Sequence, residues 1–166
     1  MIRFGPSGGI LGEPFFARHL TAAVLPSKRP GPAWRIAQIK GSAGDFVYQL
    51  EVVWVSSQGE VDSSIEVGTD AGGGTFEFSI DPGDVLTRLT GTLNWGSFNH
   101  PQVSSIQFGT ANDKASPVYG NEWSKYSFSY TSPNGFHIVG LHGRASDAID
   151  AIGVYIDDRP PVTGSK

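Results

Sequence analysis

Residues 135–155 read GFHIVGLHGRASDAIDAIGVY, and this stretch decides the fold. Two apolar runs, Phe136 to His142 and Ala148 to Ile156, are separated by a short polar segment. Short apolar runs bounded by Gly, Ser and Asp are typical of β-strands joined by a turn. Two carboxylates, Asp147 and Asp150, stand at the head of the second strand, where acids are unusual unless something needs them.

The same alternation of short apolar runs and turns continues along the whole chain. Glycine (22) and proline (11) are frequent in these 166 residues, and no segment keeps a helical period without one of them. The chain is therefore predicted to be all-β. Besides the two strands above, strands are expected at Trp34–Lys40, Phe46–Val55, Ser63–Val67, Thr75–Ile80, Leu86–Leu93, Val103–Phe108 and Tyr126–Tyr130.

The length suits one domain, which we place at residues 1–157, with a flexible Pro/Gly/Ser-rich tail at 158–166. The least regular stretch, Pro14 to Pro32, is predicted to be a long loop after a first short strand. No apolar run is long enough for a signal peptide or a membrane helix. We therefore expect no membrane insertion and a cytoplasmic protein, with secretion by a non-standard route as the alternative.

Charge and cysteine content exclude several classes of function. The net charge is −4, so the basic footprint of a nucleic-acid-binding protein is missing. There are no cysteines, which rules out disulfides, thiolate metal sites and a cysteine nucleophile. The four histidines have no metal-ligand spacing with other acids, and we expect no metal and no cofactor.

Three turn-to-strand segments share the pattern small-Asp-x-apolar-x-x-apolar, which indicates an internal repeat. They are Gly44–Leu50, Gly83–Leu89 and Ser146–Ile152. Glycine-rich turns accompany them at Gly8–Gly12, at Gly72–Gly74 and, more weakly, at Tyr119–Asn121. The pattern predicts three related β-units in one domain.

The stretch at 135–155 resembles the C-terminal signature of jacalin-related lectins. The opening GPSGG at residues 5–9, the glycine-rich turn near Gly74 and SIQFGT at 105–110 fit the same family. The resemblance covers about Arg3 to Asp157. It implies a β-prism of three four-stranded Greek-key sheets with pseudo-threefold symmetry, in agreement with the three units.

The resemblance also implies a sugar site, with mannose- or glucose-type glycans bound without metal. The family's Gly-x-x-x-Asp motif falls on residues 146–150, and a loop glycine of the family matches Gly12. The site residues so implied are Gly12, Ser146, Asp147, Ala148 and Asp150. A carboxylate can accept bonds from two neighbouring hydroxyls, so we assign that role to Asp150, while Asp147 and Ala148 donate from their backbone N–H groups. Ser146 stands where the family has glycine, and Ile10-Leu11 replace the usual small polar pair.

A second sugar site is considered in the first unit, at Asp45, Tyr48 and Gly74. In this alignment Tyr48 takes the place of Asp150 in the first unit, and Thr87 takes that place in the second unit. Galactose binding in this family is linked to a cleaved chain, and residues 1–12 show no sign of that cut, which favours mannose.

A single sugar site of this kind binds weakly, so useful binding of glycoproteins requires several sites. We therefore expect a homodimer or higher oligomer.

Other functions are weighed against this one. A galactose-preferring lectin, and a protein-interaction domain on the same scaffold that has lost sugar binding, stay open as alternatives. A glycosidase needs two facing carboxyls, but Asp147 and Asp150 tend to point apart at a strand start, so we expect no enzyme. Of the four tryptophans, Trp95 and Trp123 lie beside loops and are the better candidates for exposed sugar platforms.

Overall fold

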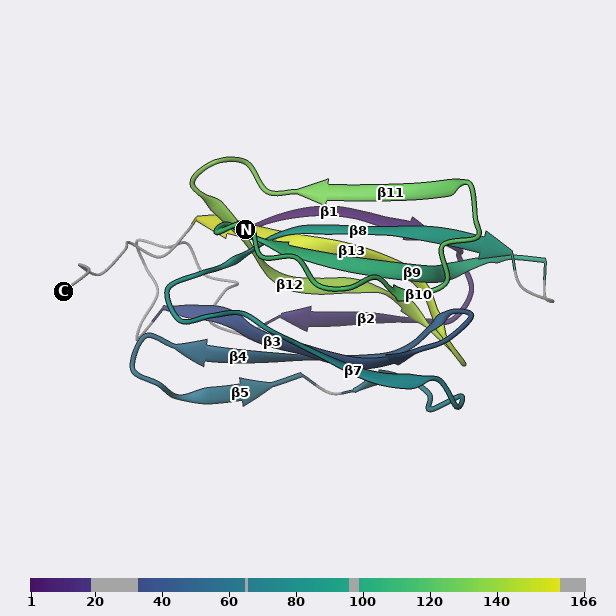
Figure 1. Cartoon of the computed structure of the whole chain (residues 1–166), viewed down its shortest axis with the longest axis horizontal. Helices are drawn as coiled ribbons and strands as arrows, with labels where there is room; N and C mark the ends of the chain where they lie inside the picture. Colours follow the sequence, from purple (N-terminus) through teal and green to yellow (C-terminus); the bar gives the residue numbers. More distant parts are fainter. Residues whose placement is uncertain (19–32, 65, 96–98, 159–166) are drawn as a thin grey trace.

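The structure is a computed structural model, and it describes residues 1–18, 33–64, 66–95 and 99–158. These residues form strands and connecting turns, and their element order contains no helix. Among them, no helix could cross a membrane. The strands run along the long axis of the molecule (Figure 1).

Three antiparallel sheets build the domain. Sheet A contains β1 (Ile2–Gly8), β13 (Ile149–Asp158), β12 (Phe136–Ala145) and β2 (Glu13–Arg18), in that order. Sheet B contains β5 (Val61–Ser63), β4 (Val47–Ser56), β3 (Trp34–Ala43) and β7 (Gly74–Ser79), with β6 (Val67–Gly68) also paired to β4. Sheet C contains β10 (Tyr119–Gly120), β9 (Pro101–Thr110), β8 (Leu86–Trp95) and β11 (Tyr126–Thr131).

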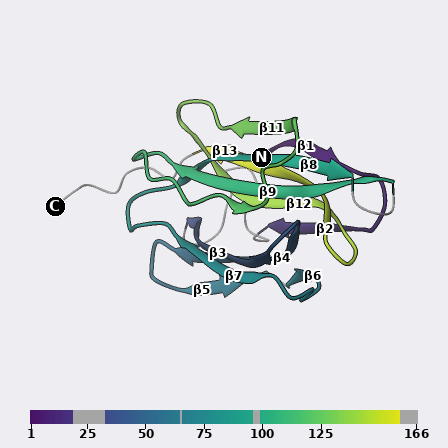
Figure 2. The ribbon, with the colours of Figure 1, turned by 45° about the vertical axis from the view of Figure 1, so that its right-hand side comes forward.

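Each sheet has the same Greek-key connectivity. Two consecutive strands form a central hairpin in each sheet. One outer strand pairs with the second strand of this hairpin, and another outer strand pairs with the first. In sheet B the first flanking position is split between β5 and β6, which pair with different parts of β4. In sheet A the two flanking strands come from the N-terminal part and the hairpin from the C-terminal part, so the chain closes its own prism. The predicted all-β class and the three four-stranded units are confirmed, and Figure 2 shows the layers from a second direction.

One core lies between the inner faces of the three sheets. It forms because alternate apolar residues of most strands point inward, while β1 and β5 contribute none of its side chains. Its completely buried members come from all three sheets, and include Ile39, Leu89, Ile106, Phe108, Ile138, Ile149 and Ile152. Trp54 also crosses between sheets, since its indole N–H donates to the carbonyl of Val139 at 2.9 Å. This shared core fixes how the loops at the ends of the sheets face one another.

Two predicted elements need correction. Glu13 to Arg18 is strand β2 and not the start of a long loop, because Phe15 and Ala17 alternate inward and pair with β12. The rest of the predicted loop, residues 19–32, lies outside the described residues. The strand predicted at Ser63–Val67 is instead the pair of short strands β5 and β6.

The predicted tail starts at residue 158, which the structure places in the last strand. Strand β13 runs through Asp158, whose N–H donates to the side chain of Asp157 at 2.9 Å. Residues 159–166 of the tail lie outside the described residues, so their flexibility stays a prediction.

The proposed alignment of the three repeats is right for the first and third units, Gly44–Leu50 and Ser146–Ile152, and wrong for the second, Gly83–Leu89. Strand registers pair Gly8 with Ala151, Gly68 with Gln49 and Gly120 with Ser105. The preceding residues Asp150, Tyr48 and Ser104 are therefore equivalent. Ser104, and not Thr87, stands in the place of Asp150 in sheet C, because the Gly83 turn leads into the first strand of its hairpin rather than the second.

Candidate functional site

The turn between β12 and β13 brings together the sequence-predicted residues 146 to 150. The N–H of Ser146 donates to the carbonyl of Ala148 at 2.9 Å, which closes the turn. The backbone N–H groups of Asp147 and Ala148 make no hydrogen bond within the described residues. Unpaired backbone donors at a turn can serve a ligand, as the sequence predicted for these two groups.

The loop from Gly9 to Gly12 lies against this turn. The N–H of Gly9 donates to the carbonyl of Asp150 at 2.8 Å. Arg144 holds the other end of the loop, since its guanidinium donates to the carbonyls of Leu11, at 3.1 Å, and Gly12. Sequence reasoning placed Gly12 here and assigned no role to Arg144.

Asp150 is completely buried behind this loop. Its Oδ1 accepts from the side-chain amide of Gln102 at 3.1 Å and lies 3.4 Å from Nε2 of His100. Its Oδ2 has no hydrogen-bond partner in the described structure and faces Gly12. A buried acceptor without a donor is costly, so Oδ2 is the polar atom of this region that most needs a partner.

Glycine is the only residue type that fits at position 12, beside this carboxylate. Its φ is +77°, in the left-handed region. A Cβ atom there would lie 2.3 Å from Oδ2 of Asp150 and 2.8 Å from the carbonyl of Ala145. The absence of a side chain therefore lets the loop approach the acid.

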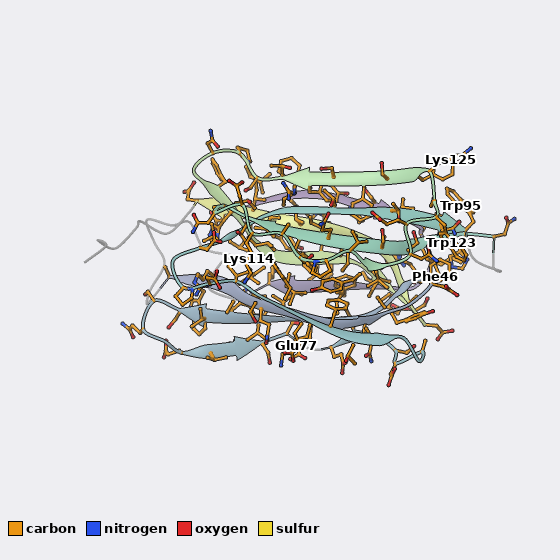
Figure 3. The ribbon with its side chains drawn as sticks, viewed as in Figure 1. Phe46, Glu77, Trp95, Lys114, Trp123 and Lys125 are labelled. Atoms are coloured by element: carbon orange, nitrogen blue, oxygen red, sulfur yellow. The ribbon has the colours of Figure 1, made fainter. Side chains whose placement is uncertain are left out.

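An open pocket of about 410 Å³ lies over this region. All three sheets contribute to its wall, through Leu11, Gly12, Ser146, Asp147 and Ala148 from sheet A, Phe46, Tyr48 and Ala71 from sheet B, and His100 and Gln102 from sheet C. A further bond ties sheet B to the site, because the hydroxyl of Thr69 donates to the carbonyl of Asp147 at 2.9 Å. Figure 3 shows Phe46 at this end of the molecule.

The pocket joins polar and aromatic surfaces. Ser146 and Asp147 are exposed at its rim, while Phe46 and Tyr48 offer ring surface across it. Such a combination suits a small polar ligand that also has an apolar face. Within the described residues no group of three or more His, Cys, Asp or Glu side chains could hold a metal ion.

The pocket described above includes one of the three residues of the second candidate site, and its lining contains neither Asp45 nor Gly74. Tyr48 lines the pocket already described, and Asp45 is exposed. Gly73, rather than Gly74, is the glycine against the Tyr48 ring, since a Cβ there would lie 2.8 Å from Cδ2. A second site in sheet B stays a prediction.

In sheet C the position equivalent to Asp150 is occupied by a buried serine. Ser104 is completely buried, and its hydroxyl lies 2.7 Å from that of Thr92. The acid of the Gly83 turn has a structural role, as Asp84 is buried and accepts from the N–H groups of Val85 and Asn112 at 2.8 and 3.1 Å. Of the three equivalent positions, only Asp150 is a carboxylate.

Comparison with known proteins agrees with this geometry. The family model described as "Jacalin-like lectin domain" matches residues 4–155. "Jacalin-related lectin 33" of Arabidopsis thaliana is 35% identical over 129 residues, which cover 76% of this chain and 42% of that protein. The chain thus spans about two fifths of the length of this curated relative.

Solved structures share the fold over nearly the whole chain. The artocarpin–mannotriose complex superposes with a TM-score of 0.77 at 24% identity, covering 94% of this chain and 97% of that one. The agglutinin of Calystegia sepium gives a TM-score of 0.75 at 26% identity, with coverage of 95% and 97%. Both comparisons identify the three-sheet prism described above.

Proposed function

Because the chain belongs to the jacalin-like lectin family, we propose that it binds glycans of the mannose and glucose type, reversibly and without a metal ion. The observation that carries this proposal is the buried, unpartnered Oδ2 of Asp150 beside Gly12. No bond of the sugar is made or broken in this activity. Artocarpin, which shares the fold, has been solved with mannotriose bound, and this supports mannose as the first sugar to test.

In the proposed complex, adjacent hydroxyls of one hexose occupy the polar side of the pocket. One hydroxyl donates to Oδ2 of Asp150, and the N–H groups of Asp147 and Ala148 donate to sugar oxygens. Hydrogen bonds to a carboxylate are the stronger kind, so Asp150 contributes most. Since Asp150 is covered, binding includes a small displacement of the Gly12 loop.

The apolar face of the sugar packs on the aromatic side of the pocket. Phe46 and Tyr48 stand on sheet B, opposite the turn of sheet A. Contact between C–H groups and a ring buries apolar area and orients the hexose. The role of Tyr48 is therefore proposed in this first site.

A single site of this kind should hold a monosaccharide with a dissociation constant on the order of millimolar, about −4 kcal/mol. Several linked sites would raise the effective affinity without new contacts. We therefore propose that the protein acts on multivalent glycans as a homodimer or larger assembly.

Calorimetric titration with methyl α-mannoside and methyl α-galactoside tests the proposed specificity. We expect binding of the mannoside and at least tenfold weaker binding of the galactoside. Galactoside preference would keep sugar binding but contradict the specificity. If the folded protein bound neither sugar at tens of millimolar, the scaffold would instead be a protein-interaction domain.

Replacing Arg144 by alanine should weaken mannoside binding about fivefold. The guanidinium holds the carbonyls of Leu11 and Gly12, and a charged hydrogen bond of this kind contributes about 1–2 kcal/mol, part of which orders the loop. Calorimetry on Arg144→Ala measures the effect, with Arg3→Ala, which removes an exposed arginine of β1, as the matched control. Equal affinity of the two variants would show that the loop does not need this anchor.

A further inference from the structure

The turn between β11 and β12 contains an Asn-Gly pair. The chain has five asparagines, and Asn134 is the only one that glycine follows. Both residues of the pair are exposed. An asparagine loses its side-chain amide when the main-chain nitrogen of the next residue attacks the side chain, and glycine hinders this attack least because it has no Cβ. Asn134 is therefore the asparagine most open to this reaction.

The fold leaves the attacking nitrogen accessible. Within the described residues, the N–H of Gly135 and the side chain of Asn134 make no hydrogen bond. A Cβ added to Gly135 would meet no atom within 4 Å, so the tip of the turn stands clear of the rest of the protein. The nitrogen can lose its proton to the solvent and approach the Asn134 side chain without displacing another part of the chain.

The other four asparagines are placed less favourably. The side-chain oxygens of Asn94 and Asn121 each accept a hydrogen bond from a tryptophan N–H, at 2.9 and 3.1 Å. Asn99 and Asn112 precede a histidine and an aspartate, whose side chains hinder the attack. Only the turn between β11 and β12 combines an asparagine, a following glycine and free space.

Both ends of this turn are fixed. The N–H of the buried Ser132 donates to the carbonyl of Thr87 at 2.8 Å, and its hydroxyl donates to the carbonyl of Phe136 at 3.2 Å. The N–H of Phe136 donates to the carbonyl of Pro133 at 3.0 Å and closes the turn. Through this turn the chain returns from sheet C to sheet A. A longer main chain here would not fit between its fixed ends.

We propose that Asn134 is a site of spontaneous deamidation. The nitrogen of Gly135 loses its proton and bonds to Cγ of Asn134, while the bond from Cγ to the amide nitrogen breaks and ammonia leaves with a proton. The product of this step is a five-membered succinimide. Water then opens one of the two ring C–N bonds, which gives aspartate or isoaspartate. Each product adds one negative charge to the net charge of −4, and water is the only co-reactant.

Isoaspartate is the product that changes the structure. Its main chain runs through Cβ and Cγ, so the turn gains one carbon atom and the bond from Phe136 to Pro133 loses its geometry. The sugar pocket lies at the other end of β12, ten residues and about 30 Å away (Figure 1). The modification therefore lowers stability and leaves sugar affinity unchanged, and this proposal does not rest on the proposed function.

The test incubates the folded wild-type protein in mildly acidic and in mildly alkaline buffer, followed by trypsin digestion and mass spectrometry. Cleavage after Lys125 and Arg144 releases residues 126–144, a peptide in which Asn134 is the only asparagine and which contains no glutamine. This peptide should gain about 1 Da, faster in alkaline buffer because hydroxide removes the proton from Gly135. Its rate should exceed that of every other asparagine in the same sample by at least about tenfold.

Two variants serve as controls. Asn134→Gln keeps the amide but requires a six-membered ring, which closes more slowly, so its peptide should keep its mass. Asn134→Asp supplies the normally linked product and should unfold at the wild-type temperature. The incubated wild-type protein, rich in isoaspartate, should unfold about 2–4 °C lower, because the hydrogen bond that closes the turn is lost.

The contrary results are equally clear. If peptide 126–144 gains mass no faster than the peptides that carry the other four asparagines, or gains it equally in Asn134→Gln, Asn134 is not a preferred site. If the fully converted wild-type protein unfolds at its original temperature, the length of this turn does not limit the stability of the prism.

Discussion

Asp150→Asn should bind methyl α-mannoside about 30- to 150-fold more weakly than the wild type. The asparagine keeps an oxygen that can accept from Gln102, so the buried contact at 3.1 Å survives. With that oxygen kept in place, the unpartnered Oδ2 is replaced by an NH2 group, which donates and cannot accept from a sugar hydroxyl. Losing one charge-assisted hydrogen bond costs about 2–3 kcal/mol, which is the stated loss of affinity.

Calorimetry on the folded variant measures this loss, with thermal unfolding as the check on folding. Glu77→Gln is the matched control, since it makes the same acid-to-amide change on an exposed carboxylate of β7. The control should bind like the wild type. An Asp150→Asn protein within threefold of wild-type affinity would show that the carboxylate does not contact the sugar.

Gly12→Ala should destabilise the protein by about 2–5 kcal/mol and abolish measurable mannoside binding. The left-handed conformation alone costs an alanine about 1–2 kcal/mol. The clash with Oδ2 of Asp150 and with the carbonyl of Ala145 adds about 1–3 kcal/mol and pushes the loop away from the turn. The free energy of unfolding in urea and the mannoside affinity should therefore change together.

Gly59→Ala separates the two causes of that loss. Gly59 has a φ of +84°, but a Cβ there would meet no atom within 4 Å. The control should lose only the conformational part, about 1–2 kcal/mol, and keep its sugar affinity. If the two variants were equally stable, the close approach of the Gly12 loop to Asp150 would be wrong.

The sequence predicts most of the fold because its signals are local. Period-two alternation and Gly/Asp/Ser turns lie within each strand pair, so the hairpins around Asp45 and Asp147 are visible without a structure. Strand β2 is missed because it begins with a Glu-Pro pair and offers only Phe15 and Ala17 as inward residues. The second repeat, Gly83–Leu89, is misaligned because Asp84 lies in a similar turn that precedes the first strand of its hairpin rather than the second.

Sequence reasoning predicts only the part of the site that lies on the β12–β13 hairpin and on the loop from Gly9 to Gly12. Residues 146 to 150 and Gly12 could be named because the resemblance to jacalin-related lectins carries over one short motif and one loop glycine. His100, Gln102 and Phe46 reach the same pocket from the other two sheets, and no spacing along the chain indicates that meeting. The closure of the prism, which depends on long-range packing, places them there.

The most direct test of the central claim, sugar binding at the Asp150 pocket, is an amide NMR titration of the labelled wild-type protein with methyl α-mannoside. Saturable shift changes should concentrate at the backbone N–H groups of Gly12, Asp147 and Ala148, and at the side-chain amide of Gln102. Methyl α-galactoside at the same concentrations should change these signals at least tenfold less. Saturable changes confined to another part of the molecule, or none in a well-folded protein, would contradict the account.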